Sequence, residues 1–308
     1  MAASEQRPQF LERIVQLKRQ ELASCELRLP QRELEKKIKP RSARVFRRAL
    51  LSPKSRGPRQ GDASREGNPA QSESRGVSRA ATVPGEKSPA CAVIAEIKKA
   101  SPSQGVLCER YDPAVIAKSY EQAGACALSV LTESEFFLGS LEHLRQVKAA
   151  SLLPVLRKDF TLADYHLYEA AAAGADAVLL IVAILSPQEL VRLLGLSRNL
   201  GLDAVVEVHQ AEELHIALDA GSDIIGVNNR DLKTFEVSLT TSFRLISSIP
   251  DEVVAISESG LRTAVDLERL RAVGFDAFLI GERFMTQGDP GQALAHLLSQ
   301  VDAREAVI

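Results

Sequence analysis

Eight short apolar runs alternate with helical stretches in the part of the chain after residue 90. The runs are rich in Val, Ile, Leu and Ala, and polar residues are scarce within them. Such runs are typical of parallel strands that are buried on both faces, and strands that alternate with helices predict βαβ units. The eight runs cover residues 91–98, 126–132, 154–159, 176–182, 203–208, 223–228, 253–258 and 276–281.

An internal repeat precedes every second run. It reads AGACAL, AGADAVLL, AGSDIIGV and VGFDAFLI, and its glycines are Gly124, Gly174, Gly221 and Gly274. A Gly in this position is typical of a helix C-cap followed by a tight turn into a strand. Each interval between these glycines holds two βα units, so the repeat fixes the number of units at eight.

Eight βα units predict the α/β class and a closed (β/α)8 TIM barrel over residues 91–308. A doubly wound open sheet is the alternative. That fold would normally carry a glycine-rich dinucleotide loop after its first strand, whereas the first strand here is followed by KKASPSQG.

The first 90 residues follow a different pattern. Residues 9–24 place apolar side chains at mostly helical spacing, and a second helical stretch runs from about 31 to 51, interrupted near Pro40. We therefore expect residues 1–51 to form an N-terminal helical extension that packs on the barrel. In residues 52–90, Gly, Pro and Ser make up 17 of 39 positions, which predicts a disordered linker or insertion.

Composition narrows the class of protein. The chain is 45% hydrophobic and 25% charged, as in ordinary soluble globular proteins. It has neither an 18-residue apolar run nor the apolar core of a secretory signal, so we expect a cytoplasmic protein with no membrane partner.

The four cysteines neither pair at C-x-x-C spacing nor cluster with histidines. We therefore expect no disulfide, no metal site and a reducing compartment, although an organelle remains an alternative to a bacterial cytoplasm.

The net charge of −2 hides an asymmetry. Residues 1–90 hold 20 Lys and Arg against 10 Asp and Glu, a balance of +10, while residues 91–308 hold 18 against 30, a balance of −12. A basic tail could bind nucleic acid. The basic residues are scattered among acids and prolines, however, with only two aromatic residues, so we expect no nucleic-acid partner.

Polar residues end several of the apolar runs. In a (β/α)8 barrel the active site lies at the C-terminal ends of the strands, and this position is taken by Glu96, Lys98, Lys158, Glu207, Asn228 and Glu258. Glu96 and Lys98 are two residues apart and share a face, whereas Lys99 points away. A ring of salt bridges that closes the barrel is the alternative, but so many costly polar groups at one end favour a catalytic site.

The last two strands end in glycine-containing segments, SESG (257–260) and IGER (280–283). Each puts a Gly where a backbone N–H can approach an anion. The loops after strands seven and eight form the common phosphate site of such barrels. The two segments together therefore predict a phosphorylated small-molecule substrate.

Seven collinear segments resemble the signatures of indole-3-glycerol phosphate synthases, and together they cover nearly all of residues 91–308. The helix at 9–24 also resembles the segment that caps these barrels. The seven segments are VIAEIKKASPSQG (93–105), LTESEFFLGS (131–140), LRKDF (156–160), VVEVH (205–209), GVNNRDLKTF (226–235), ISESG (256–260) and LIGERFM (279–285).

The resemblance implies a reaction in tryptophan biosynthesis. It is the ring closure, decarboxylation and dehydration of 1-(2-carboxyphenylamino)-1-deoxyribulose 5-phosphate to indole-3-glycerol phosphate, with no cofactor and no metal. Phosphoribosylanthranilate isomerase and the tryptophan synthase α subunit are alternatives, but they use a Cys/Asp or a Glu/Asp pair where this chain has Glu-x-Lys. A non-catalytic barrel with a nucleic-acid-binding tail is a third possibility, against which the intact set of strand-end charges argues.

The resemblance also assigns catalytic roles. Lys158, with a pKa lowered in a partly dry pocket, would protonate the ribulose carbonyl oxygen. Lys98 would pair with the substrate carboxylate, and Glu207 would be the base of the dehydration. Asn228 and Glu258 would orient the sugar hydroxyls and the ammonium groups. Glu96 stands beside Lys98, and the acid of the dehydration stays open.

Substrate-binding roles follow in the same way. Ser101 lies in a loop that would close over the substrate, and Arg230 would bind it. Phe137 and Phe160 would pack on its aromatic ring, with simple core packing as the alternative for both. Backbone N–H groups would hold the phosphate at Ser259, Gly260, Gly281 and Glu282. We expect a monomer. The 52–90 segment is longer than the family usually has and leaves open how the N-terminal helix docks over the site.

Overall fold

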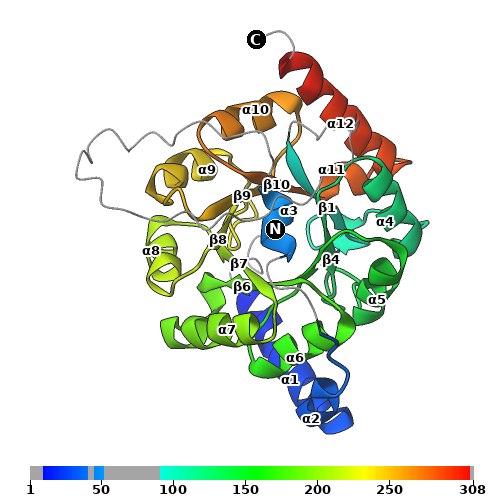
Figure 1. Ribbon diagram of the computed structural model, residues 1–308, viewed down its shortest axis with the longest axis vertical. Helices are drawn as coiled ribbons and strands as arrows, with labels where there is room; N and C mark the ends of the chain where they lie inside the picture. Colours follow the sequence, from blue (N-terminus) through cyan, green and yellow to red (C-terminus); the bar gives the residue numbers. More distant parts are fainter. Residues whose placement is uncertain (1–9, 41–44, 52–90, 306–308) are drawn as a thin grey trace, which may run out of the picture.

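Eight parallel strands close into a barrel in the computed structural model, which describes residues 10–40, 45–51 and 91–305. The predicted linker at 52–90 lies outside the described residues. Around the ring the order is β1-β10-β9-β8-β7-β6-β5-β4 (Figure 1), so the closed barrel is confirmed and the open sheet is excluded. The strands are β1 (Ala92–Ile97), β4 (Ala127–Leu131), β5 (Val155–Lys158), β6 (Ala177–Ile181), β7 (Asp203–Val208), β8 (Ile224–Asn228), β9 (Val254–Glu258) and β10 (Ala277–Ile280).

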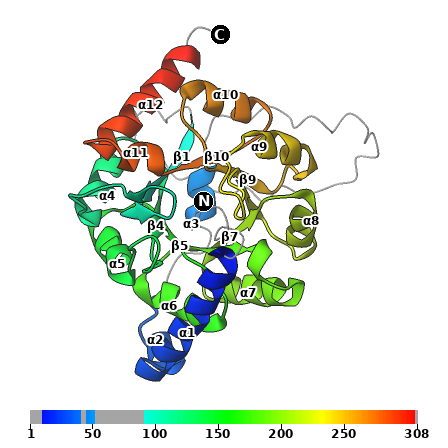
Figure 2. The same cartoon turned by 180° about the vertical axis from the view of Figure 1, so that it is seen from behind.

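A ring of helices surrounds the strands (Figures 1 and 2). The short strands β2 (Ala100–Ser101) and β3 (Gly105–Val106) form a small antiparallel sheet in the loop after β1. None of the described helices is long and apolar enough to cross a membrane. The helices after β1 are α4 (Pro113–Gln122), α5 (Leu141–Ala150), α6 (Asp164–Ala173), α7 (Pro187–Asn199), α8 (Ala211–Asp219), α9 (Thr240–Leu245), α10 (Ala264–Ala272), α11 (Glu282–Met285) and α12 (Pro290–Glu305).

Strand alternation divides the core into two layers. Inside the barrel, Ile94 of β1 clusters with Leu156, Val205 and Ile256, whereas the neighbouring residue Val93 packs among the residues that face the helices. Because side chains alternate along a strand, the residues that continue the inward rows at the C-terminal ends are Glu96, Lys98, Lys158, Glu207 and Glu258.

The repeated glycines adopt the conformation that a C-cap requires. Gly124, Gly174, Gly221 and Gly274 have φ values of 95°, 95°, 80° and 112°, which favour glycine over other residues. The Asp of the repeat binds the neighbouring strand. Asp176 accepts a hydrogen bond from the backbone N–H of Val155, and Asp276 accepts one from Ala255, each at 2.8 Å. The repeat therefore fixes both the turn and the start of the adjacent strand.

The described part of the N-terminal extension contains three helices, α1 (Phe10–Arg28), α2 (Gln31–Glu35) and α3 (Val45–Leu50). A second helical stretch was predicted over about 31–51 with an interruption near Pro40, and α2 and α3 lie on either side of that proline. Helix α2 ends at Glu35, and Pro40 disfavours helical backbone at Lys39 just before it. Residues 41–44 lie outside the described residues.

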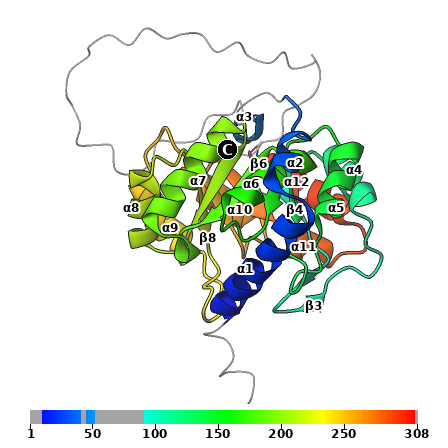
Figure 3. The same ribbon diagram turned by 90° about the horizontal axis from the view of Figure 1, so that it is seen from below.

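Helix α3 closes the N-terminal end of the barrel. It lies at the centre of the ring in Figure 1, at the opposite end of the barrel from the start of α1 (Figure 3). Phe46 and Leu50 are fully buried in the cluster that fills the barrel interior. The barrel is thus plugged below, and its polar end is the C-terminal mouth.

His166 on α6 makes the stability of the fold depend on pH. Its Nδ1 accepts a hydrogen bond from the backbone N–H of Leu162 at 3.1 Å, which requires a neutral ring. Burial, aided by the charges of Arg157 and Lys18, lowers the pKa of His166 to about 3. An unfolded histidine titrates near 6.5, so the stabilising contribution is present above that pH and is lost as the pH falls toward 3.

Replacing His166 by Asn is therefore expected to flatten the acid side of the stability profile. Below pH 6 the free energy of unfolding of the wild type falls by up to about 1.4 kcal/mol per pH unit because the unfolded chain binds one more proton at this residue. The variant lacks this contribution. Urea unfolding of both proteins at pH 7.5, 6 and 5 measures the difference. Parallel curves would contradict the assignment.

Candidate active site

A cavity of about 470 Å³ opens at the C-terminal mouth of the barrel. All the site residues predicted from the sequence line it, and Lys99, predicted to point away, does not. The predicted residues found there are Glu96, Lys98, Ser101, Phe137, Lys158, Phe160, Glu207, Asn228, Arg230, Glu258, Ser259, Gly260, Gly281 and Glu282.

Lys158 lies between two carboxylates. Its Nζ is 2.7 Å from Glu207 Oε2 and 3.0 Å from Glu258 Oε2. Burial alone would lower the pKa of Lys158, but the charges of Glu207 and Glu258, with Glu96 further away, raise it above the ordinary lysine value. The expectation of a lowered pKa was wrong, because it considered the dry pocket without the carboxylates that two other strands bring to it.

The two carboxylates differ in their affinity for a proton. Burial would raise the pKa of Glu207, but Lys158 and His209 outweigh burial and lower it. Burial and the charge of Glu207 raise the pKa of Glu258, although Lys158 opposes them. The site thus combines an ammonium group, a carboxylate that stays ionised and a carboxylate that takes up a proton more easily. Such a set can both donate and accept protons.

Glu258 has a free oxygen. Its Oε1 is buried without a hydrogen-bond partner among the described residues. Any side chain at Gly226 would collide with this atom, so Gly226 gives the carboxylate its space. An unsatisfied buried acceptor on the cavity wall suits a ligand hydroxyl.

A second ion pair lies beside the first. Lys98 Nζ is 2.8 Å from Glu96 Oε1, and both side chains are largely buried. A Cβ on Gly281 would lie 2.5 Å from the same oxygen and 2.8 Å from the Glu96 Cβ. Glycine at the end of β10 is therefore required by the close approach of Glu96.

The loops after β9 and β10 meet at the cavity. Ser259 and Gly260 adopt positive φ values of 66° and 78°. Asn229 Nδ2 donates to the carbonyl oxygens of Glu258 and Ser259, at 2.9 and 3.1 Å, and so fixes the turn. The four residues predicted to hold phosphate thus line one cavity from two adjacent strand ends.

The Glu282 side chain has a role that the sequence did not indicate. Its carboxylate accepts hydrogen bonds from Arg230 Nη2 at 3.3 Å and from Gln104 Nε2. Gln104 lies in the loop after β1 that carries Ser101. The Glu282 carboxylate therefore joins this loop to the loops after β8 and β10.

Sequence reasoning also missed contributions from α1 and from the loop after β4. Phe10 and Leu11 line the cavity, and the Phe10 ring packs edge-on against Phe136 and Phe235, with centroids 4.9 and 5.0 Å apart. Glu133 accepts the backbone N–H groups of residues 135, 136 and 137 and so shapes the loop that carries Phe137. The resemblance indicated that the helix at 9–24 caps the barrel, but its helical pattern did not show that Phe10 and Leu11 reach the cavity.

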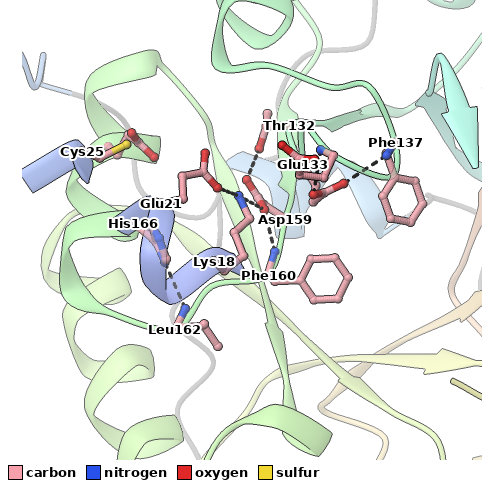
Figure 4. A network of polar contacts seen from close by, with 12 residues as sticks. Lys18, Glu21, Cys25, Thr132, Glu133, Phe137, Asp159, Phe160, Leu162 and His166 are labelled. Atoms are coloured by element: carbon pink, nitrogen blue, oxygen red, sulfur yellow. Dashed lines mark hydrogen bonds and ion pairs between the residues drawn. The ribbon is translucent and has the colours of Figure 1, made fainter. Parts of the chain in front are cut away.

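Asp159, the residue after Lys158, holds α1 in place (Figure 4). Its Oδ1 is 2.8 Å from Lys18 Nζ and accepts the backbone N–H of Phe160. Its Oδ2 accepts hydrogen bonds from Thr132 and Arg157, at 2.6 and 3.1 Å. The side chains of Lys18 and Asp159 are only 4% and 3% exposed, so a buried ion pair ties the N-terminal helix to β5.

The fold and this cluster define a (β/α)8-barrel enzyme with its acid–base groups at the C-terminal mouth. The sequence profile of indole-3-glycerol phosphate synthases matches residues 67–297. The chain therefore belongs to the indole-3-glycerol phosphate synthase family.

Similar proteins agree with this assignment. An indole-3-glycerol phosphate synthase of Ruminiclostridium cellulolyticum is 53% identical over 204 residues, which cover 66% of this chain and 78% of the relative. One of Polynucleobacter asymbioticus is 50% identical over 207 residues, covering 67% and 78%.

Solved structures share the fold at low identity. A mandelate oxidase variant matches with a TM-score of 0.55 at 16% identity, covering 70% of this chain and 73% of that one. KGPDC from Streptococcus mutans matches with a TM-score of 0.54 at 11% identity, covering 69% and 98%. These likenesses concern the barrel fold alone.

Proposed function

We propose that this protein is an indole-3-glycerol phosphate synthase. It converts 1-(2-carboxyphenylamino)-1-deoxyribulose 5-phosphate to indole-3-glycerol phosphate, carbon dioxide and water. The observation that carries the proposal is the Glu207–Lys158–Glu258 cluster beside the Lys98–Glu96 pair, in a cavity with two glycine-containing strand ends. The family acts on a phosphorylated small molecule, and the loops after β9 and β10 suit its phosphate.

The substrate lies across the cavity with its phosphate at the backbone of Ser259, Gly260, Gly281 and Glu282. Its aromatic ring packs between Phe137 and Phe160, and its carboxylate pairs with Lys98. Arg230 and the loop of Ser101 complete the enclosure. The unsatisfied Oε1 of Glu258 accepts from a sugar hydroxyl, and Asn228 supports the same end of the substrate.

In the first step, the ring carbon that bears the carboxylate bonds to the ketone carbon. The C=O electron pair moves to oxygen, which takes a proton from the Lys158 ammonium. Lys158 is protonated at neutral pH because its carboxylate partners raise its pKa. The bond to the carboxylate then breaks, carbon dioxide leaves, and the electron pair of that bond restores the aromatic ring.

In the second step, the new hydroxyl leaves as water and the neighbouring carbon loses a proton, which forms the indole double bond. Glu207 accepts that proton, and the Glu96–Lys98 pair supplies the proton to the leaving hydroxyl. The low pKa of Glu207 keeps it ionised and ready to act as a base. We propose that one chain suffices for this chemistry, since each residue named comes from the same barrel.

The direct test is incubation of the purified protein with the carboxyphenylamino-deoxyribulose phosphate while indole fluorescence is recorded. A rise in fluorescence with release of one carbon dioxide per product is expected. A folded protein that leaves this substrate unchanged would exclude the proposed function.

A further inference from the structure

His209 stands on the far side of Glu207 from Lys158. It is the first residue after β7 and lies two positions beyond Glu207. His209 Nε2 is 3.4 Å from Glu207 Oε1, whereas Lys158 contacts the other oxygen, Oε2. Each oxygen of the Glu207 carboxylate thus faces a different basic side chain.

Glu213 holds the His209 ring from behind. Its Oε2 is 3.0 Å from His209 Nδ1 and also accepts the backbone N–H of His209 at 2.7 Å. Glu213 lies in the first turn of α8, so the helix fixes the carboxylate. With Nδ1 bound to Glu213, Nε2 is the ring nitrogen that faces Glu207 across an ion pair.

The surroundings favour an imidazolium ring. Burial would lower the pKa of His209, but its contacts with the Glu207 and Glu213 carboxylates raise it to about 10. Asp231, in the loop after β8, is a further carboxylate that interacts with the ring, and Lys158 contacts the other oxygen of Glu207. Both ring nitrogens are then donors, and Nε2 has no closer partner among the described residues.

We propose that His209, fixed by Glu213, is a positioning residue that keeps Glu207 ionised and oriented while Lys158 is engaged with the substrate. This inference rests on the proposed function, in which Lys158 gives up its proton before Glu207 acts. Once Lys158 is neutral, Glu207 loses one of its two cationic partners. A buried carboxylate without a cation would take up a proton and could not serve as the base.

The imidazolium prevents this protonation of Glu207 because it stays beside Oε1 throughout the reaction. At 3.4 Å the Nε2–Oε1 contact is an ion pair longer than a normal hydrogen bond. It has room to shorten when Lys158 turns toward the substrate. A purely structural role for His209, that of securing the start of α8, predicts a change in stability with no change in the pH dependence of turnover.

Replacing His209 by Asn tests the inference. We expect the acid limb of the kcat profile to move up by about one pH unit, so that kcat falls about tenfold at a pH on that limb. The kcat profile reports the substrate complex and kcat/KM the free enzyme, so the kcat limb should move further. Glu213→Gln should move it in the same direction by less. His215→Asn, on the exposed face of the same helix, is the matched control and should change neither.

An unmoved acid limb in both His209→Asn and Glu213→Gln would overturn the inference, whatever their melting temperatures. A second measurement does not depend on turnover. Titration of the labelled histidine ring by NMR should find His209 protonated through pH 8, and a neutral ring at pH 7 would also overturn it. A wild-type protein that fails to convert the substrate would exclude the proposed function, while the ring titration would still decide the charge of His209.

Discussion

Replacement of Lys158 by Met is expected to lower turnover by about 10²-fold or more, the usual scale of a lost general acid. The side chain is central to the site, with Glu207 and Glu258 both within 3.0 Å of its Nζ. Methionine has a similar length and removes the proton donor. The variant is expected to stay folded, because one of the two carboxylates takes up a proton once the cation is gone.

Indole fluorescence gives the turnover of this variant, and circular dichroism with thermal melting gives its folding. Lys99→Met is the matched control, since Lys99 is also a lysine at the end of β1 but does not line the cavity. It should keep turnover within a few-fold of the wild type. If Lys158→Met turned over like the wild type, the acid in the ring closure would have to be another group.

The fold could be predicted from the sequence because its signals are local. Each apolar run contains one strand, and the Gly of the repeat marks a turn that requires positive φ. Alternation within a strand then decides which residues face inward, so Lys98 could be separated from Lys99 without a structure. The same reasoning placed the polar strand ends around one cavity, since the C-terminal ends of parallel strands meet at one end of a barrel.

The remainder depends on contacts between distant segments. The pKa of Lys158 could not be predicted from β5 alone, because its direction is set by carboxylates from β7 and β9. The position of α1 over the mouth depends on Lys18, which in the sequence is one of many basic residues in a basic segment. An amphipathic pattern predicts a helix but does not identify its partner. In this protein the partner, Asp159, lies 141 positions further along the chain.

Replacement of Lys18 by Met is expected to lower the free energy of unfolding by about 3 kcal/mol. Removing one partner of a buried ion pair typically costs about 3–5 kcal/mol because the other charge stays buried. The lower end applies here, since Asp159 keeps Arg157 and Thr132 as partners. KM should also rise, because α1 carries Phe10 and Leu11 to the cavity wall. Urea unfolding and steady-state kinetics measure the two effects.

A matched control and a double-mutant cycle identify the source of that loss. Lys36→Met removes an ion pair with Glu33 in which the lysine side chain is 68% exposed, and should change stability by less than about 0.5 kcal/mol.

Asp159→Asn alone should also lower the free energy of unfolding. The double variant with Lys18→Met should lose less than the sum of the two single losses, by about 1–3 kcal/mol for residues in direct contact. Strict additivity would show that the two charges do not stabilise each other. The N-terminal helix would then depend for its position on the aromatic contacts of Phe10 with Phe136 and Phe235.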